Sequence, residues 1–250
     1  MNDPLFDLTD RVVLITGGSR GLGAAMSVAL AQRGARVIIA SRKLEACRDL
    51  AARIADGGGQ AHALACHVGH WDSLDAVIDA AVVRWGRLDG LVNNAGMSPL
   101  APSLLDTSET LFDKVVGVNL KGPTRLTALA ATAMAGTGGG SIVNISSLAS
   151  LRPTPLTTVY AAAKAGLNAL TSATAREYAS VGVRVNGIIC GTFDTDAAAG
   201  LVDNPEILRG IALGRIGRPD EVVGAAVYLM SEASSYTTGS LMTIDGGVGG

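Results

Sequence analysis

Short runs of apolar and β-branched residues recur along the chain, and the segments between them have the spacing of amphipathic helices. An apolar run of this length, bounded by polar or glycine-rich residues, is typical of a strand buried on both faces. The predicted strands cover residues 12–16, 37–40, 61–68, 88–92, 142–145, 183–189 and 241–244. The predicted helices cover residues 22–33, 44–54, 74–85, 108–134 and 157–178.

This alternation predicts βαβ units, and right-handed crossovers arrange such units as a doubly wound parallel sheet with helices on both faces. No linker or low-complexity tract divides the chain, so residues 1–250 are predicted to form a single Rossmann-like α/β domain. The alternation is interrupted at residues 192–213, an alanine-rich stretch with acidic residues in which Pro205 is expected to begin a short helix. Such a segment beside the sixth strand is a candidate substrate lid.

The composition argues against membrane and nucleic-acid proteins. Charged residues make up 17% of the chain, below the usual ~25%, and hydrophobic residues reach 48%. We therefore expect part of the surface to be covered in an oligomer. The longest uncharged stretch, residues 126–151, is interrupted by the glycine-rich segment 136–141 and cannot be one membrane helix. A net charge of −2 gives no support to nucleic-acid binding.

The three cysteines and the first residues of the chain point to a reducing compartment. The cysteines are odd in number and lack metal-ligand spacing, and the first ten residues hold three aspartates and no apolar leader. We therefore expect a cytoplasmic protein. His62, His67 and His70 lie close together in the sequence without a supporting ligand set, so they are expected to be strand and loop histidines rather than a metal site.

A glycine-rich turn joins the first predicted strand to the first helix. Gly17, Gly21 and Gly23 would let backbone N–H groups and the helix N-terminus approach a pyrophosphate, with Ser19 and Leu22 in the same turn. Met26 occupies the place of the third glycine of the strict dinucleotide fingerprint. A plain tight turn is the alternative interpretation.

The end of the second strand indicates which dinucleotide is preferred. An acid there would hold the adenine ribose hydroxyls of NAD(H), whereas an arginine accommodates the 2′-phosphate of NADP(H). The chain has Ser41 and Arg42 at this place, and Arg20 in the glycine turn faces the same site. The residues therefore predict NADP(H) as the preferred cofactor, with NAD(H) possible. Two solvated surface arginines are the alternative.

Three asparagines lie in or next to apolar segments, where a polar side chain is unusual. Asn93 and Asn94 end the fourth strand and are followed by Ala95 and Gly96, small residues beside which a cofactor could cross the sheet edge. Asn119 lies inside an apolar helical segment, where a buried amide needs hydrogen-bond partners. A structural hydrogen bond is an equally good interpretation of Asn119.

Tyr160 and Lys164 are the strongest candidates for chemistry. Three alanines between them favour a helix, on which residues four apart project from the same face. A nearby cation favours the phenolate of a tyrosine, so the pair could act as a general acid and base near neutral pH. Ser147, at the end of the fifth strand, could donate to the same carbonyl oxygen. A half-buried tyrosine beside a solvated lysine is the structural alternative.

These motifs occur in one order at compatible spacings, and together they strongly resemble the short-chain dehydrogenase/reductase family. The resemblance extends from Thr16 to Gly247 and includes the residues around Arg215 and Asp245 that are similar to a 3-oxoacyl-reductase-like branch. It implies that Tyr160 is the general acid in reduction and the base in oxidation. Lys164 would lower the pKa of Tyr160 and hold the nicotinamide ribose.

The resemblance also assigns supporting roles. Ser147 would bind the substrate oxygen, and Asn119 would anchor a water in a proton relay through Lys164. Thr195 would contact the nicotinamide carboxamide. The full set of implied cofactor contacts is Gly17, Ser19, Arg20, Gly21, Leu22, Gly23, Ser41, Arg42, Val68, Asn93, Ala95, Gly96, Tyr160, Lys164, Gly191 and Thr195.

Two residues depart from the family pattern. Cys190 stands where the family usually has proline before the glycine, and His67 stands where an aspartate often holds the adenine. The helix ends that carry basic residues in carrier-protein-dependent reductases are here residues 136–140 and Val181, which offer no cation. This weighs against a role in fatty-acid synthesis.

The sequence therefore predicts an NADPH-dependent carbonyl reductase, or alcohol dehydrogenase in reverse, for a small and largely apolar ketone or secondary alcohol. A sugar or polyol dehydrogenase and a 3-oxoacyl thioester reductase are the alternatives, and a non-catalytic dinucleotide-binding regulator is a remote one. A homotetramer is expected. The candidate pocket walls are Met97, Leu148, Leu151, Pro155, Cys190, Phe193 and Leu201.

Overall fold

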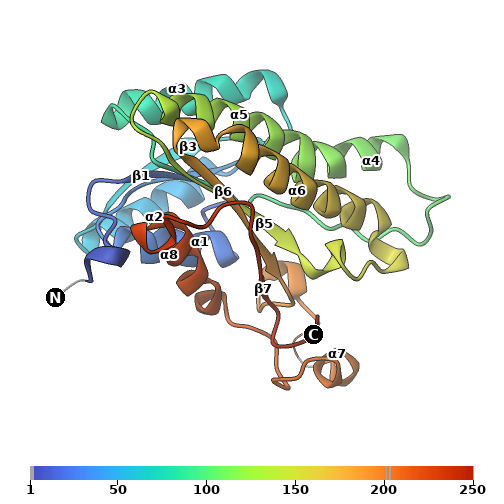
Figure 1. The fold of residues 1–250 in the computed structure, drawn as a ribbon. Helices are drawn as coiled ribbons and strands as arrows, with labels where there is room; N and C mark the ends of the chain where they lie inside the picture. The colour runs from blue at the N-terminus through green and yellow to red at the C-terminus, as the bar shows by residue number, and fades with distance from the viewer. Residues whose placement is uncertain (1–2, 201, 203, 250) are drawn as a thin grey trace.

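A computed structural model describes residues 3–200, 202 and 204–249. Its centre is a seven-stranded parallel sheet in the order β3-β2-β1-β4-β5-β6-β7 (Figure 1). The strands are β1 Val12–Thr16, β2 Arg36–Ser41, β3 Gln60–Ala65, β4 Gly90–Asn93, β5 Gly140–Ser147, β6 Val183–Cys190 and β7 Leu241–Ile244. The helices are α1 Gly21–Ala31, α2 Leu44–Asp56, α3 Leu74–Trp85, α4 Glu109–Val116, α5 Gly122–Ala135, α6 Thr158–Glu177, α7 Pro205–Arg209 and α8 Val223–Met230.

Helices cover both faces of the sheet because the strands are apolar on both faces. In β1, Val13 and Ile15 pack into one core with α1, α2 and α8, while Val12 and Leu14 pack into a second core with α3 and α5. Figure 1 shows α3, α5 and α6 above the sheet and α1, α2 and α8 below it. The doubly wound parallel sheet that the sequence predicts is therefore confirmed.

The order of the strands reverses between β1 and β4. The chain builds β1, β2 and β3 outward to one edge, returns to place β4 beside β1, and then continues to the other edge. Ligands of doubly wound sheets bind outside the carboxyl ends of the strands at such a reversal. The glycine turn after β1 and the segment after β4 both lie there.

The predicted long helix over residues 108–134 is wrong in one respect. A π-helical turn, Gly117–Lys121, separates α4 from α5, and Pro123 lies in the first turn of α5. Gly122 is required at this junction because a Cβ there would lie 2.2 Å from the carbonyl oxygen of Val68. The third strand also ends at Ala65 rather than Val68, and the fourth begins at Gly90 rather than Leu88.

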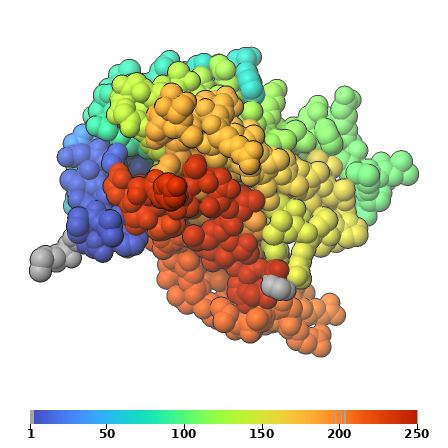
Figure 2. All heavy atoms as spheres, in the orientation of Figure 1, coloured from blue at the N-terminus to red at the C-terminus, as the bar shows by residue number. Residues whose placement is uncertain are grey.

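The segment after β6 leaves the body of the molecule. It carries α7, which begins at Pro205 as predicted, and it protrudes at the lower edge of the views in Figures 1 and 2. Among the residues that the structure describes, no helix is long and apolar enough to cross a membrane.

Candidate active site

Ser147, Tyr160 and Lys164 meet at the carboxyl edge of the sheet. Ser147 is the last residue of β5, and Tyr160 and Lys164 lie one turn apart near the start of α6. The hydroxyl of Ser147 acts on the phenol of Tyr160 and lowers its pKa. The ammonium nitrogen of Lys164 is 5.9 Å from the centroid of the Tyr160 ring. The structure thus brings together the three residues for which the sequence predicts chemistry.

Lys164 is held in place by the backbone of β5. Its Nζ donates a 2.7 Å hydrogen bond to the carbonyl oxygen of Ile145, and the residue is only 4% exposed. Burial disfavours the charged form and lowers the pKa of Lys164 to about 8. An ammonium with a pKa in this range can exchange its proton near neutral pH, unlike an ordinary surface lysine.

The pKa of Tyr160 is raised by burial. Desolvation raises the pKa of the phenol above its usual value, and the hydroxyl of Ser147 only partly offsets this. Tyr160 is therefore protonated at neutral pH, which suits a proton donor. The effect of Lys164 on this pKa stays a prediction.

Cys190 occupies the position beside the catalytic pair where the family pattern has proline. It ends β6 and is paired in register with Ser147 on β5. Burial raises the pKa of the Cys190 thiol to about 12, although Lys164 acts in the opposite direction. The thiol remains neutral, so Cys190 contributes a small apolar surface rather than a charge.

Asn119 holds the segment that follows β4. Its side-chain amide donates to the carbonyl oxygens of Met97 at 2.8 Å and Val115 at 2.9 Å, and its Oδ1 accepts from the amide of Met97 at 3.2 Å. The side chain is fully buried inside the π-helical turn. The structure therefore shows the structural hydrogen bonds that were one of the two interpretations of Asn119, while the water-anchoring role stays a prediction.

The two asparagines that end and follow β4 point in different directions. The amide of Asn93 donates to Asn144 at 2.8 Å and to Thr127 at 3.2 Å, and the residue is 2% exposed. Its side chain is therefore turned into the core, so Asn93 can meet a cofactor only through its backbone. Asn94 instead donates to the carbonyl oxygens of Thr16 and Gly17 and fixes the glycine turn.

The glycine turn leaves the N-terminus of α1 suited to an anion. Helix α1 begins at Gly21, and in the described structure no side chain caps it and no acidic residue lies in its first turn. Gly17 has a positive φ of 62°, and a Cβ on Gly23 would lie 2.2 Å from the carbonyl oxygen of Gly17. Uncapped N–H groups at a helix start are an anion site, so the turn fits the pyrophosphate of a dinucleotide.

The residues predicted to face the adenosine lie close to this turn. The hydroxyl of Ser19 donates to that of Ser41 at 3.1 Å, and Arg42 follows Ser41 on the surface. Arg20 forms an exposed ion pair with Asp196 at 2.8 Å. This ion pair, which the sequence did not reveal, ties the glycine turn to the segment after β6. Val68 is buried in the core.

The segment after β6 passes over the glycine turn. A Cβ on Gly21 would lie 3.2 Å from the methyl group of Thr195, so these two residues are neighbours. Gly191 is needed where the segment begins, because a Cβ there would lie 2.7 Å from Asp245.

Two of the predicted pocket walls lie in this segment. Phe193 is 5% exposed and belongs to the core beside Gly217. Leu201 lies outside the described residues.

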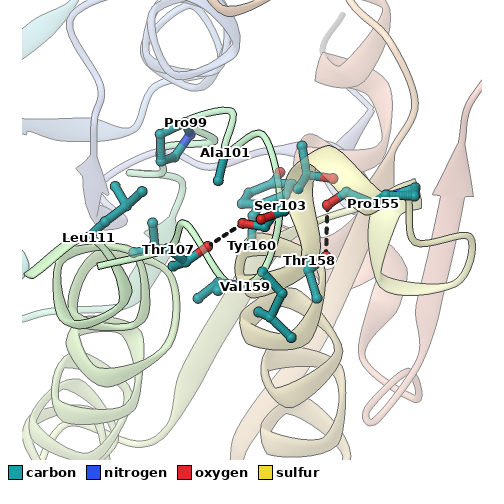
Figure 3. Close-up of a pocket in the computed structure, with 12 residues that line it drawn as sticks. Pro99, Ala101, Ser103, Thr107, Leu111, Pro155, Thr158, Val159 and Tyr160 are labelled. Carbon is teal, nitrogen blue, oxygen red and sulfur yellow. Dashed lines mark hydrogen bonds between the residues drawn. The ribbon is translucent and has the colours of Figure 1, made fainter. Parts of the chain in front are cut away.

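A small pocket, with a cavity volume of about 10 Å³, lies beside Tyr160, between the segment after β4 and the start of α6 (Figure 3). Of the predicted pocket walls, Pro155 lines it. The other wall of the pocket was not predicted from the sequence, although the two prolines and several leucines of residues 99–105 could have indicated a structured loop. The lining residues are Pro99, Ala101, Ser103, Leu104, Thr107, Leu111, Val115, Pro155, Thr157, Thr158, Val159 and Tyr160. Among these described residues, only Tyr160 is ionisable.

Comparison with known proteins agrees with this geometry. Residues 17–249 match a family model described as enoyl-(acyl carrier protein) reductase. The chain is 37% identical to the 3-oxoacyl-(acyl-carrier-protein) reductase FabG of Chlamydia muridarum, over 96% of this chain and 98% of that protein.

Two solved structures share the fold closely. A short-chain type dehydrogenase/reductase from Mycobacterium marinum has a TM-score of 0.93 and 35% identity, covering 98% of this chain and 97% of the other. A gluconate 5-dehydrogenase from Burkholderia cenocepacia, in complex with NADP and tartrate, has a TM-score of 0.93 and 34% identity with the same coverage.

Proposed function

Because the chain belongs to the short-chain dehydrogenase/reductase family of NAD(P)-dependent oxidoreductases, we propose that it reduces small, largely apolar ketones with NADPH. The reverse reaction is the oxidation of the corresponding secondary alcohols. The observation that carries this proposal is the pocket beside Tyr160, whose other described lining residues are uncharged. Pocket walls without charged side chains favour neutral substrates over carboxylates and phosphates.

The side chains of this site would act on the substrate oxygen. The bound nicotinamide supplies the hydride, and the protein orients the substrate and moves the proton. The hydroxyl of Ser147 would donate a hydrogen bond to the carbonyl oxygen, and the phenol of Tyr160 would transfer its proton to that oxygen as the C–H bond forms. Lys164, whose pKa is about 8, would return a proton toward Tyr160.

The preference for NADP(H) is proposed from the charges around the adenosine site. Arg42 follows β2, no acidic residue ends that strand, and Arg20 lies in the glycine turn. A dianionic 2′-phosphate would bind beside these cations, whereas NAD(H) offers them only hydroxyls. NAD(H) remains a usable second cofactor in this proposal.

A sugar or polyol dehydrogenase is the second candidate. Ser103, Thr107, Thr157 and Thr158 supply hydroxyl groups to the pocket, and the chain is similar to a gluconate 5-dehydrogenase. A 3-oxoacyl thioester reductase is favoured by the similarity to FabG. A non-catalytic regulator would bind cofactor without turnover.

Three further features belong to the proposal. Residues 192–213 would form a substrate lid, supported by the contact of Thr195 with the glycine turn and by the ion pair between Arg20 and Asp196. The assembly would be a homotetramer, and the protein would act in the cytoplasm.

The deciding experiment compares initial rates of NADPH and NADH oxidation across ketones, β-keto esters, ketoses and 3-oxoacyl thioesters. The proposal expects turnover of apolar ketones with NADPH preferred. Faster turnover of ketoses would favour the second candidate, and faster turnover of thioesters the third. A preference for NADH would show that Arg20 and Arg42 do not select the cofactor.

A further inference from the structure

The turns that follow β2 and β3 lie side by side at the carboxyl edge of the sheet. Ser41 is paired in register with Ala65, and the amide of Cys66 donates to the carbonyl oxygen of Ser41 at 2.9 Å. Arg42 and His67 are the next residues on these two turns. His67 therefore lies beside the arginine that is proposed to bind the 2′-phosphate.

His67 does not stand alone in its turn. Its ring stacks on that of His70, with the two centroids 4.1 Å apart and the planes 7° from parallel. The amide of Gly69 donates to Nδ1 of His67 at 3.2 Å, so the neutral ring carries its proton on Nε2. The contact with His70 fixes the plane of the His67 ring.

The charged groups that act on His67 are positive. Burial is the largest cause that lowers the pKa of His67, and His70, Arg42 and Lys114 on α4 lower it further. None of the charged groups that act on His67 among the described residues is an acid. An imidazole beside cations holds a proton weakly, and a dianion bound beside the same cations would strengthen its hold on the proton.

We infer that His67, which stacks on His70, is a proton-linked part of the cofactor site and takes up a proton when the 2′-phosphate of NADP(H) binds beside Arg42. Binding and protonation then favour each other by linkage. NAD(H) lacks this phosphate and draws no proton to His67. The preference for NADP(H) over NAD(H) therefore increases as the pH falls. This inference rests on the proposed use of NADP(H).

Binding of cofactor fragments tests the inference without turnover. Calorimetry of the full chain with 2′,5′-ADP and with 5′-AMP, in buffers of different ionisation enthalpy, gives both affinities and the number of protons exchanged. Between about pH 8 and about pH 6.5, we expect the affinity ratio of 2′,5′-ADP over 5′-AMP to rise about threefold, as for one screened charge pair. Proton uptake should accompany 2′,5′-ADP alone.

The sign of the proton exchange distinguishes a proton taken up by the protein from a proton released by the ligand. A phosphate monoester has a second pKa near ~6, and its binding to arginine releases the ligand's proton. The His67→Gln/His70→Gln double variant should lose the uptake and the pH dependence of the ratio. The matched control is His62→Gln, which changes a histidine inside β3 that packs against Trp85 and should leave both unchanged.

Two outcomes would overturn the inference while leaving the proposed function intact. The first is a preference for 2′,5′-ADP that is independent of pH in the wild-type chain, without proton uptake. The second is a double variant with the same uptake as the wild type. A wild-type chain that binds 2′,5′-ADP no better than 5′-AMP at any pH would instead remove the proposed NADP(H) preference, and the inference with it.

Discussion

At the scale of single residues, spacing predicts which side chains meet but not what burial does to their pKa values. Tyr160 and Lys164 face each other because residues four apart share a helix face. The raised pKa of Tyr160 and the lowered pKa of Lys164 follow from desolvation, which depends on neighbours distant in the sequence. The same holds for Asn93, whose amide is turned into the core by Asn144 and Thr127.

Removing the phenolic hydroxyl tests the role of Tyr160. We expect Tyr160→Phe to lower kcat for ketone reduction about 10²- to 10⁴-fold, the usual contribution of a positioned general acid, with little change in cofactor affinity. Stopped-flow turnover and fluorescence titration with NADPH would measure the two effects. Tyr236→Phe, at a fully exposed tyrosine, is the matched control and should keep wild-type turnover. Retention of most activity in Tyr160→Phe would refute the proton-donor role.

The raised pKa of Tyr160 also sets a pH dependence. Alcohol oxidation needs the phenolate, so its rate should increase with pH throughout the neutral and alkaline range. Ketone reduction needs the phenol and should be insensitive to the Tyr160 proton below its raised pKa. Rates in both directions, measured on one substrate pair at saturating cofactor, would show this asymmetry. An oxidation rate that is flat across the neutral range would contradict it.

At the scale of secondary-structure elements, the apolar runs predict all seven strands. The strands of a parallel sheet buried on both faces consist mostly of apolar residues, so each appears in the sequence as a continuous apolar run. The π-helical turn at Gly117–Lys121 was not predictable, because one extra residue in a turn barely changes an apolar pattern. Such turns often occur at functional sites. Here it places Asn119 where it can bind both the amide and the carbonyl of Met97.

The bonds from Asn119 should be measurable as stability. Asn119→Ala would leave the part-buried backbone groups of Met97 and the buried carbonyl of Val115 without their partner, at a cost of about 1–3 kcal/mol for each group that water cannot reach. We expect a Tm lower by several degrees and faster hydrogen exchange at Met97. Asn204→Ala, which removes the exposed side-chain cap of α7, is the comparison and should cost only about 1 kcal/mol or less. Equal decreases in the free energy of unfolding of the two variants would show that the buried bonds of Asn119 stabilise the fold no more than an exposed helix cap.

At the scale of the whole molecule, the fold collects the site from separate strands because all seven strands run in parallel. The glycine turn, the segment after β4, Ser147 and Cys190 all follow or end different strands at one edge. The sequence was sufficient to predict that these residues gather at one edge of the sheet, since each motif directly follows an apolar run. It was not sufficient for the pocket, because one of its walls comes from the irregular segment after β4, which has no periodic pattern.

The proposed tetramer is tested by mass. Low charge content and large exposed apolar side chains, among them Phe112 on α4 and Val181 after α6, favour burial between chains. Light scattering after size exclusion should give the mass of four chains at micromolar concentration. Phe112→Glu should shift the distribution to smaller species if α4 lies in an interface. A wild-type monomer at that concentration would contradict the proposal.

The two bonds between Asn119 and Met97 have a consequence for how such an enzyme can change over evolution. The segment that begins at Met97 supplies one wall of the pocket, and the catalytic pair lies on the other side, on α6. Asn119 contacts Met97 through the backbone of Met97 alone. We therefore expect the side chains that follow Met97 in the sequence to vary without moving Tyr160 or Lys164. Grafting residues 98–107 from a relative should therefore transfer substrate choice while the chemistry is inherited unchanged.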